Sequence, residues 1–303
     1  MNSPRRSLLR LALLSSLAWM VGCDEEKRAQ EPQYLHQSPS QGERVVRFGV
    51  HPLHNPQKLH RVFAPLMAYL ERRIPGTRFE LEASNNYAHY EQKLKARRFE
   101  FALPNPYQTM LARDWGYRVI AKLDDDQDFR GIFLVRADSG ISQPADLRGK
   151  AVSYPAPTAL AAAMMPQLYL QKHGLDVNRD IENHYVGSQE SSIMSVYLSR
   201  SAAGATWPPP WRTFQKNHAK EAAALRVAWE TPPLINNAFV ARRDLPEGLT
   251  NQVRLALLGL GESADGKAIL ADMESRGIVA AEDRDYAVVE HFMAEFVARV
   301  RPL

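Results

Sequence analysis

Residues 45–73 read VVRFGVHPLHNPQKLHRVFAPLMAYLERR: a short apolar run, a polar turn and a longer amphipathic run. The opening run is valine-rich and too short for a helix, so it predicts a strand. In the later run, apolar residues such as Leu59, Val62, Phe63 and Leu66 recur three and four positions apart, which is the spacing of a helix with one buried face. The stretch therefore predicts a strand followed directly by a helix.

The same alternation continues along the chain and predicts an α/β fold. Further strands are predicted at 78–83, 99–103, 117–123, 131–135, 151–154, 183–186, 204–207, 225–229 and 237–240. Further helices are predicted at 87–98, 105–115, 158–173, 190–199, 249–262, 266–275 and 286–300. Such alternation favours mainly parallel sheets flanked by helices. Because the pattern forms two blocks, we expect two lobes around a ligand cleft, lobe 1 from 45–136 plus 236–303 and lobe 2 from 137–235.

The first 22 residues are typical of an export signal. Several arginines precede an apolar run, 8–21, which is shorter than the roughly 20 apolar residues that span a bilayer. The run ends in Val21-Gly22-Cys23, which resembles a lipobox, so we expect cleavage after residue 22 and a lipid on Cys23. An ordinary buried thiol does not fit a cysteine placed between an apolar signal and a charged stretch. As Cys23 is the only cysteine, the mature domain has no internal disulfide.

The segment that follows the signal predicts where the protein is held. Residues 23–44 are charged and rich in Gln, Pro and Ser, so we expect a flexible tether. Asp24 is similar to the residue that retains many lipoproteins on the inner membrane, which predicts a periplasmic protein anchored there. Arg5-Arg6 is compatible with a twin-arginine signal or with an ordinary positive start, and the sequence leaves both export routes open.

The composition excludes several classes of protein. The chain is 45% hydrophobic and 24% charged, as globular proteins are. Its net charge is +4, but three of these charges belong to arginines of the signal, so no clustered basic face for nucleic acid is expected. We expect a monomer.

The candidate ligand residues lie in the turns that follow predicted strands, where α/β sheets bind ligands and helix N-termini favour anions. Each polar residue at a helix start is also a common N-cap, and the sequence leaves that alternative open. Asn237, at the return between lobes, either binds ligand or turns the chain. The other candidates in these turns are His51, Tyr87, Asn105, Tyr107, Thr158, Ser188, Gln189, Glu190 and Trp207.

Arg130 is the candidate cation. Its guanidinium matches a tetrahedral oxyanion through two parallel hydrogen bonds if the side chain faces the cleft. The alternative is a surface ion pair with Asp126 or Asp128.

No catalytic, metal-binding or cofactor motif is present in the sequence. There is no Gly-x-Ser-x-Gly elbow, Walker loop or Gly-x-Gly-x-x-Gly, so we expect no enzyme and no cofactor. His51, His54 and His60 lie close together, but without the spacing of a zinc site. The acidic run 124–128 lacks the glycine and the final glutamate of a calcium loop, so no metal is expected.

Several stretches resemble the phosphate/phosphite/phosphonate substrate-binding proteins of ABC transporters. These are VRFGVHP at 46–52, 99–106, DLRGKAV at 146–152 and the turns of the second lobe, and the resemblance extends over residues 44–303. It implies the type II periplasmic binding protein fold. It also implies that Tyr87 and Tyr107 lie near the aromatic walls of the phosphonate cleft.

Two turns depart from the pattern of that family. Where its phosphonate binders carry Ser-Thr-Ser at a helix start, residues 157–161 read PTALA, so that Thr158 is the only hydroxyl left. Where they carry Ser-His-Asp, this chain has Ser188-Gln189-Glu190. Both changes remove hydrogen-bond donors that would hold a phosphonate.

The resemblance and the signal together predict a lipid-anchored binding protein that captures a small anion and delivers it to an ABC permease in the inner membrane. The alternative is a ligand-sensing or accessory lipoprotein of the same fold with no transport role, since fold alone does not fix function.

Overall fold

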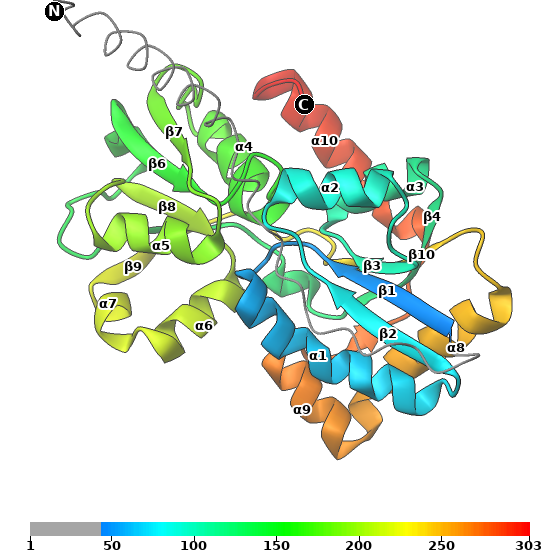
Figure 1. The fold of residues 1–303 in the computed structure, drawn as a ribbon. Coiled ribbons are helices and arrows are strands. Elements are labelled where there is room, and N and C mark those ends of the chain that lie inside the picture. Colours follow the sequence, from blue (N-terminus) through cyan, green and yellow to red (C-terminus); the bar gives the residue numbers. More distant parts are fainter. Residues whose placement is uncertain (1–43) are drawn as a thin grey trace, which may run out of the picture. The chain divides into compact units, whose positions relative to one another are not determined.

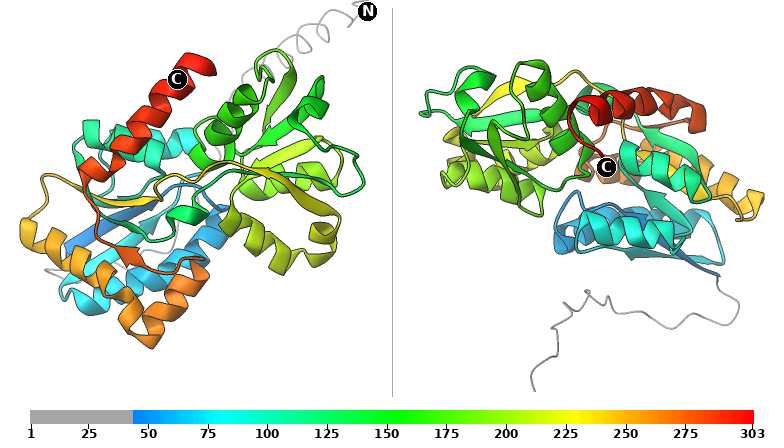
Figure 2. Two further views of the ribbon diagram at one scale, coloured as in Figure 1. Left: turned by 180° about the vertical axis from the view of Figure 1, so that it is seen from behind. Right: turned by 90° about the horizontal axis from the view of Figure 1, so that it is seen from above.

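The computed structural model describes residues 44–303. The predicted signal peptide, Cys23 and all but the last residue of the predicted tether lie outside the described residues. The described part contains two β-sheets, each covered by helices on both faces, and the chain passes twice between them (Figures 1 and 2). The predicted pair of α/β lobes is therefore confirmed.

The first lobe is built on a six-stranded sheet with the order β11-β4-β10-β3-β1-β2. Strands β1, β2 and β3 pair in parallel, whereas β10 and β11 pair antiparallel with their neighbours. In β2 buried and part-exposed residues alternate strictly, as expected for a strand with one buried face. The strands are β1 (Arg44–Val50), β2 (Thr77–Glu82), β3 (Phe101–Leu103), β4 (Tyr117–Leu123), β10 (Ala238–Arg242) and β11 (Ile278–Val279).

Two layers of helices cover this sheet. Helices α1, α8 and α9 share one hydrophobic core with it, and α1 and α9 lie side by side (Figure 1). Asn55 caps α1 by accepting a hydrogen bond from the backbone nitrogen of Lys58 at 2.9 Å, and Pro56 occupies the first turn. The helices are α1 (Pro56–Arg73), α2 (Tyr87–Lys95), α3 (Pro106–Asp114), α8 (Glu247–Leu258), α9 (Ala264–Asp272) and α10 (Ala287–Arg299), with 3-10 turns at Asp126–Asp128, Leu260–Glu262 and Asp283–Tyr286.

The second lobe contains a five-stranded sheet with the order β7-β6-β8-β5-β9. Its strands are β5 (Ile132–Arg136), β6 (Lys150–Tyr154), β7 (Ile181–Tyr185), β8 (Ala203–Thr206) and β9 (Leu225–Glu230). The sequence placed β5 at the end of the first lobe, and this assignment is wrong. β5 pairs antiparallel with β8 and β9, so the boundary between the lobes falls before Ile132. Because β10 and β11 in the first sheet and β5 in the second pair antiparallel with their neighbours, both sheets are mixed rather than mainly parallel.

The helices of the second lobe differ from the predicted ones in two places. The sequence predicts no helix between 199 and 249, but Pro208–Asn217 is helix α6, because proline is tolerated in a first turn, where backbone N–H groups have no helical partner. The predicted helix at 158–173 begins as a π-helix, Leu160–Met164, and continues as α4 (Met165–Lys172). The remaining helices are a 3-10 turn at Pro144–Leu147, α5 (Gln189–Tyr197) and α7 (Ala219–Ala223).

The two segments that connect the lobes, 124–131 and 231–237, are hydrogen-bonded to each other. Thr231 N donates to Gly131 O at 2.8 Å, and Gly131 N donates to the Thr231 hydroxyl at 2.9 Å. Leu234 N donates to Phe129 O at 2.9 Å. Two short connecting segments of this kind can act as a hinge, because torsion changes in a few of their residues are enough to move one rigid lobe relative to the other.

The C-terminal helix α10 contacts both lobes, since it packs on α3 of the first and on α4 of the second (Figure 1). Lys172 Nζ lies 2.8 Å from Glu295 Oε2, and the backbone oxygen of Val300 accepts a 2.6 Å hydrogen bond from Asn178. No helix within 44–303 has the length and hydropathy needed to cross a bilayer.

Candidate ligand-binding site

The ends of several strands and the starts of four helices meet between the lobes. Each of these helices, α1, α2, α3 and α5, has a side-chain N-cap, and two of the caps, Asn105 and Ser188, are residues that the sequence left open as cap or ligand. Asn86 accepts from His89 N at 2.8 Å, Asn105 from Gln108 N at 2.9 Å and Ser188 from Ser191 N at 3.0 Å. Asn105 and Ser188 therefore act as N-caps in this structure.

A small cavity between the lobes, here called the inner chamber, brings together five of the sequence candidates: His51, Tyr87, Asn105, Gln189 and Trp207. Its volume is about 10 Å³, which is room for one water molecule. The remaining walls are Phe129 and the consecutive residues Ala159, Leu160, Ala161 and Ala162, so no Lys, Arg, Asp or Glu is among the described residues that line it.

His51 presents a hydrogen-bond acceptor to the inner chamber. Its Nδ1 lies 2.9 Å from the carbonyl oxygen of Leu103, an acceptor, so Nδ1 carries the ring proton and Nε2 is left with a lone pair. Burial lowers the pKa of His51 to about 4, although the hydrogen bond to Leu103 opposes that decrease, and the ring is neutral at pH 7. The rings of Tyr87 and Tyr90 meet it edge-on at 6.1 and 6.4 Å.

Gln189 lines one side of the inner chamber. Its Oε1 accepts a 2.8 Å hydrogen bond from the Thr206 hydroxyl, and its side chain also hydrogen-bonds the hydroxyl of Tyr87 across the cleft. Burial raises the pKa of Tyr87, so the phenol stays neutral. All polar groups of this chamber are thus uncharged.

Thr158, the hydroxyl that the family resemblance placed at the ligand, is bonded to protein instead. Its Oγ1 donates to Glu91 Oε1 at 2.7 Å, and its backbone oxygen accepts from Asn105 Nδ2 at 3.0 Å. Both partners belong to the first lobe, so Thr158 ties the lobes together.

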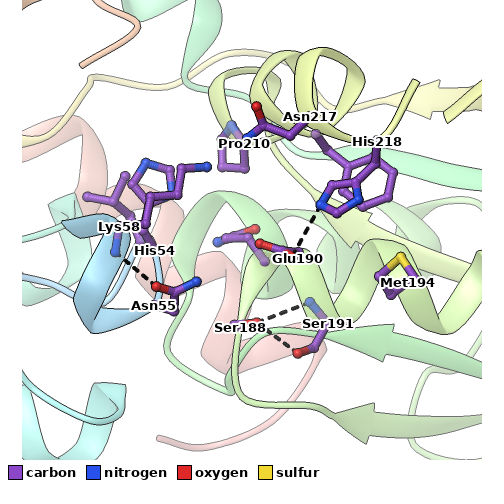
Figure 3. A pocket seen from close by; sticks show the side chains of 13 residues that line it. His54, Asn55, Lys58, Ser188, Glu190, Ser191, Met194, Pro210, Asn217 and His218 are labelled. Carbon is purple, nitrogen blue, oxygen red and sulfur yellow. Dashed lines mark hydrogen bonds and ion pairs between the residues drawn. The ribbon is translucent and has the colours of Figure 1, made fainter. Parts of the chain in front are cut away.

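A second and larger cavity, here called the outer chamber, shares Gln189 with the inner chamber as a lining residue. Figure 3 shows the side chains that line it. Its volume is about 280 Å³, close to the lower end for small-molecule sites. The first lobe contributes the loop before α1 and its first turn, and the second lobe contributes the start of α5 and the end of α6. The lining residues are Leu53, His54, Asn55, Lys58, Ser188, Gln189, Glu190, Ser191, Met194, Pro210, Phe214, Asn217 and His218.

Charged and titratable groups stand on both walls of the outer chamber. Burial, and then the charge of Lys58, lowers the pKa of His54 to about 3, so His54 is neutral at pH 7. Burial also lowers the pKa of Lys58, and Glu190 opposes that decrease. On the opposite wall, Glu190 Oε1 lies 3.5 Å from His218 Nε2, and Figure 3 shows the two side chains pointing toward one another.

The other sequence candidates line neither chamber. Arg130 forms ion pairs with Glu230 at 2.8 Å and Asp128 at 3.3 Å, which is the surface alternative, so the expected cleft cation is not there. Tyr107 is buried in the hydrophobic core. Asn237 is buried, and its Oδ1 has no hydrogen-bond partner within residues 44–303.

Lys58 and the aromatic residues of these chambers other than Tyr87 and Trp207 are not among the residues predicted from the sequence. Lys58 stands in the first turn of a helix that follows a strand-end turn already singled out, so its position was available as a signal. Phe129, Phe214 and His218 had none, because only the packing of α6 and of the crossing segment brings them to the cleft.

Comparison with known proteins decides the family. The family described as "ABC transporter, phosphonate, periplasmic substrate-binding protein" matches residues 48–286, which include both sheets and both chambers. The chain belongs to this family. The predicted resemblance is thereby confirmed.

Individual phosphonate-family proteins are only distantly similar in sequence. The chain is 24% identical over 185 residues to a probable ABC transporter phosphite-binding protein of Prochlorococcus marinus. That match covers 57% of this chain and 62% of the relative, so the chain spans less than two thirds of the relative's length.

Solved structures share the fold. A binding protein component of an ABC phosphonate transporter from Pseudomonas aeruginosa superposes with a TM-score of 0.77 at 17% identity, over 86% of this chain and 90% of that one. The Prochlorococcus marinus protein PhnD1, solved with methylphosphonate, gives a TM-score of 0.77 at 20% identity, over 83% of this chain and 98% of that one. The two-lobed fold of periplasmic binding proteins is thus shown for this family member.

Proposed function

We propose that the protein is the solute-binding component of an ABC importer, which captures a small anion of the phosphonate, phosphite or phosphate type between its lobes and presents it to a permease. The observation that carries this proposal is the pair of chambers between the lobes, each lined by residues of both. A ligand held there favours the closed form, and closure about the paired crossing segments is the signal a permease reads. Relatives named for phosphite binding and solved with methylphosphonate support the ligand class.

The test is thermal unfolding of the protein against phosphate, phosphite, methylphosphonate, longer alkylphosphonates and sulfate. A ligand at a hundred times its Kd adds about 2.7 kcal/mol of stability to the form that binds it. A shift with one anion and none with the others establishes capture of that class. If no anion of the panel raises the unfolding temperature, the function as an anion receptor is wrong.

We further propose that Cys23 carries the lipid anchor and that the protein is held at the periplasmic face of the inner membrane. The support is the lipobox-like run before the only cysteine and Asp24 after it. Labelling cells with an alkyne fatty acid tests this. Label on the wild type and none on Cys23→Ser supports the anchor, and equal labelling of both sinks it.

A further inference from the structure

The end of the chain connects the first lobe to the second. Helix α10 packs on α3 and on the 3-10 turn Asp283–Tyr286, so its main support is the first lobe. Just beyond the helix, the backbone oxygen of Val300 accepts a 2.6 Å hydrogen bond from Asn178, and Arg301 Nη2 donates to the backbone oxygen of Pro157 at 2.8 Å. Asn178 and Pro157 both belong to the second lobe. The two residues after α10 therefore hold the lobes against each other.

Arg301 is anchored on the first lobe by its own side chain. Its guanidinium carbon lies 5.2 Å from the centre of the ring of Phe296, which is a fully buried residue of α10. Burial, and then Glu91, raises the pKa of Tyr107, and the charge of Arg301 opposes that increase, so the guanidinium also lies close to α3. A planar guanidinium stacks on a ring with its face and donates hydrogen bonds from its edge at the same time. Arg301 uses the edge for the carbonyl of the opposite lobe.

The carbonyl that Arg301 holds belongs to a wall of the inner chamber. Residues 157–162, here called the chamber loop, consist of two residues followed by the four that line the inner chamber. Groups of the first lobe hold this loop at two further points, because Asn105 Nδ2 donates to the backbone oxygen of Thr158 at 3.0 Å and Glu91 accepts from the Thr158 hydroxyl at 2.7 Å. All three bonds must break when the lobes separate.

The chamber loop depends on these bonds because its own helix start is weakly fixed. The π-helix Leu160–Met164 begins in the loop, and among the described residues no side chain caps it. A helix start without a cap leaves its first backbone N–H groups without a local partner. The position of this backbone is therefore set by contacts from the other lobe, of which Arg301 supplies one.

We propose that Arg301 is a positioning residue: by holding the Pro157 carbonyl it fixes the chamber loop against the first lobe and so lengthens the time that a bound anion stays between the lobes. The part that concerns the anion rests on the proposed function. A contact that forms only when the lobes close acts after the ligand has entered. It therefore slows dissociation of the ligand and leaves association nearly unchanged.

The test compares Arg301→Met with the wild type, both as full-length chains in detergent. In hydrogen–deuterium exchange without ligand, we expect the amides of Leu160–Met164 to exchange about fivefold faster in the variant, and those of β1 to keep their rate. In stopped-flow kinetics with methylphosphonate as the probe, we expect the dissociation rate to rise about fivefold and the association rate to stay within about twofold.

Three further variants sharpen the comparison. Arg301→Lys keeps a cation and a donor and should recover most of the wild-type behaviour. Adding Asn178→Ala to Arg301→Met removes both bonds of the chain end and should give a larger increase than Arg301→Met alone. Arg284→Met is the matched control, because Arg284 is an exposed arginine that pairs with Glu282 within the first lobe, and it should change nothing.

The possible failures are distinguishable. Equal exchange of Leu160–Met164 in Arg301→Met and the wild type refutes the positioning role, whether or not an anion binds. Faster exchange of β1 together with Leu160–Met164 also refutes it, because Arg301 would then act on global stability. If the loop responds as expected but the wild type does not bind methylphosphonate, the positioning is supported, and the longer residence of that anion fails together with the proposed function. A slower association with an unchanged dissociation rate overturns the effect on residence as well.

Discussion

Thr158 and Glu91 join the two lobes through a 2.7 Å hydrogen bond from the threonine hydroxyl to the carboxylate. Glu91 lies on α2 of the first lobe, while Thr158 lies just before the π-helix of the second. The same carboxylate oxygen accepts a 3.1 Å hydrogen bond from Gln108 Nε2, which holds it in place. The contact therefore stabilises the closed arrangement rather than the ligand itself.

Thr158→Val should shift the protein toward an open form. A hydrogen bond to a charged group contributes about 1.5–3 kcal/mol, enough to change an equilibrium constant by tenfold or more. Small-angle scattering should show a larger radius of gyration for the ligand-free variant. Thr158→Ser keeps the hydroxyl and should match the wild type, and an unchanged radius in Thr158→Val would show that the bond has no part in closure.

A second link between the lobes is ionic. The carboxylate of Glu274, just after α9, forms ion pairs with Arg212 Nε at 3.0 Å and with Lys216 Nζ at 2.6 Å, and both cations lie on α6. Its side chain is only 15% exposed, so screening by solvent is limited. Glu274→Gln should lower the free energy of unfolding by about 1 kcal/mol at low salt, and by nearly as much at high salt.

Denaturant unfolding at two salt concentrations measures this effect. Glu290→Gln is the control, because Glu290 pairs with Arg113 and is 50% exposed, and exposed pairs contribute little. An equal loss in both variants would contradict a special role for Glu274.

His51 should make stability depend on pH. Its pKa falls from 6.5 in the unfolded chain to about 4 in the fold, so between these values the unfolded state binds the extra proton and stability decreases as the pH falls. The loss approaches about 3 kcal/mol below pH 4. His54, whose pKa is lowered to about 3, adds in the same direction, while the neighbouring phenols of Tyr87 and Tyr90 stay neutral over this range.

Chemical denaturation from pH 7 to pH 4 checks this, with His51→Asn as the comparison, since asparagine keeps a donor for the Leu103 carbonyl and does not titrate. We expect a flatter profile for the variant. Parallel profiles would mean that folding does not lower the pKa of His51.

Gly131 lies where the first crossing segment enters the second lobe and leaves no room for a side chain. An added Cβ would lie 2.5 Å from the carbonyl oxygen of Ala161 and 2.8 Å from Pro166. Gly131→Ala should therefore cost about 1–3 kcal/mol of stability. In Gly248→Ala, where a Cβ meets nothing within 4 Å, we expect no loss or a small gain, because alanine favours the helix. Similar unfolding temperatures for the two variants would argue against this close approach.

Local patterns predicted most of the fold. Apolar spacing predicted helix α1, because amphipathic periodicity and an Asn-Pro start leave little choice. The same reasoning failed for α6, whose three leading prolines imitate a turn, and for β5, whose lobe depends on which distant strands it pairs with. Sequence periodicity carries information on neighbours three or four residues away but none on partners a hundred residues away.

The candidate site was predicted in part for the same reason. Strand-end turns led to His51, Tyr87 and Gln189, which do meet in one chamber. Lys58 was missed because a lysine on a helix usually points to solvent, and only the packing of α6 opposite it shows that this lysine lines a chamber.

The contact of α10 with both lobes limits how the cleft opens. The lobes are connected by the two crossing segments, 124–131 and 231–237, and both lobes also contact α10. With three connections, the lobes can move apart about the crossing segments more easily than they can rotate against each other. Opening must also disturb the contact between α4 and α10. A fluorophore at Leu303 would therefore sense occupancy of a cavity it never touches, so the carboxyl end of the chain is the natural place for an optical reporter of uptake.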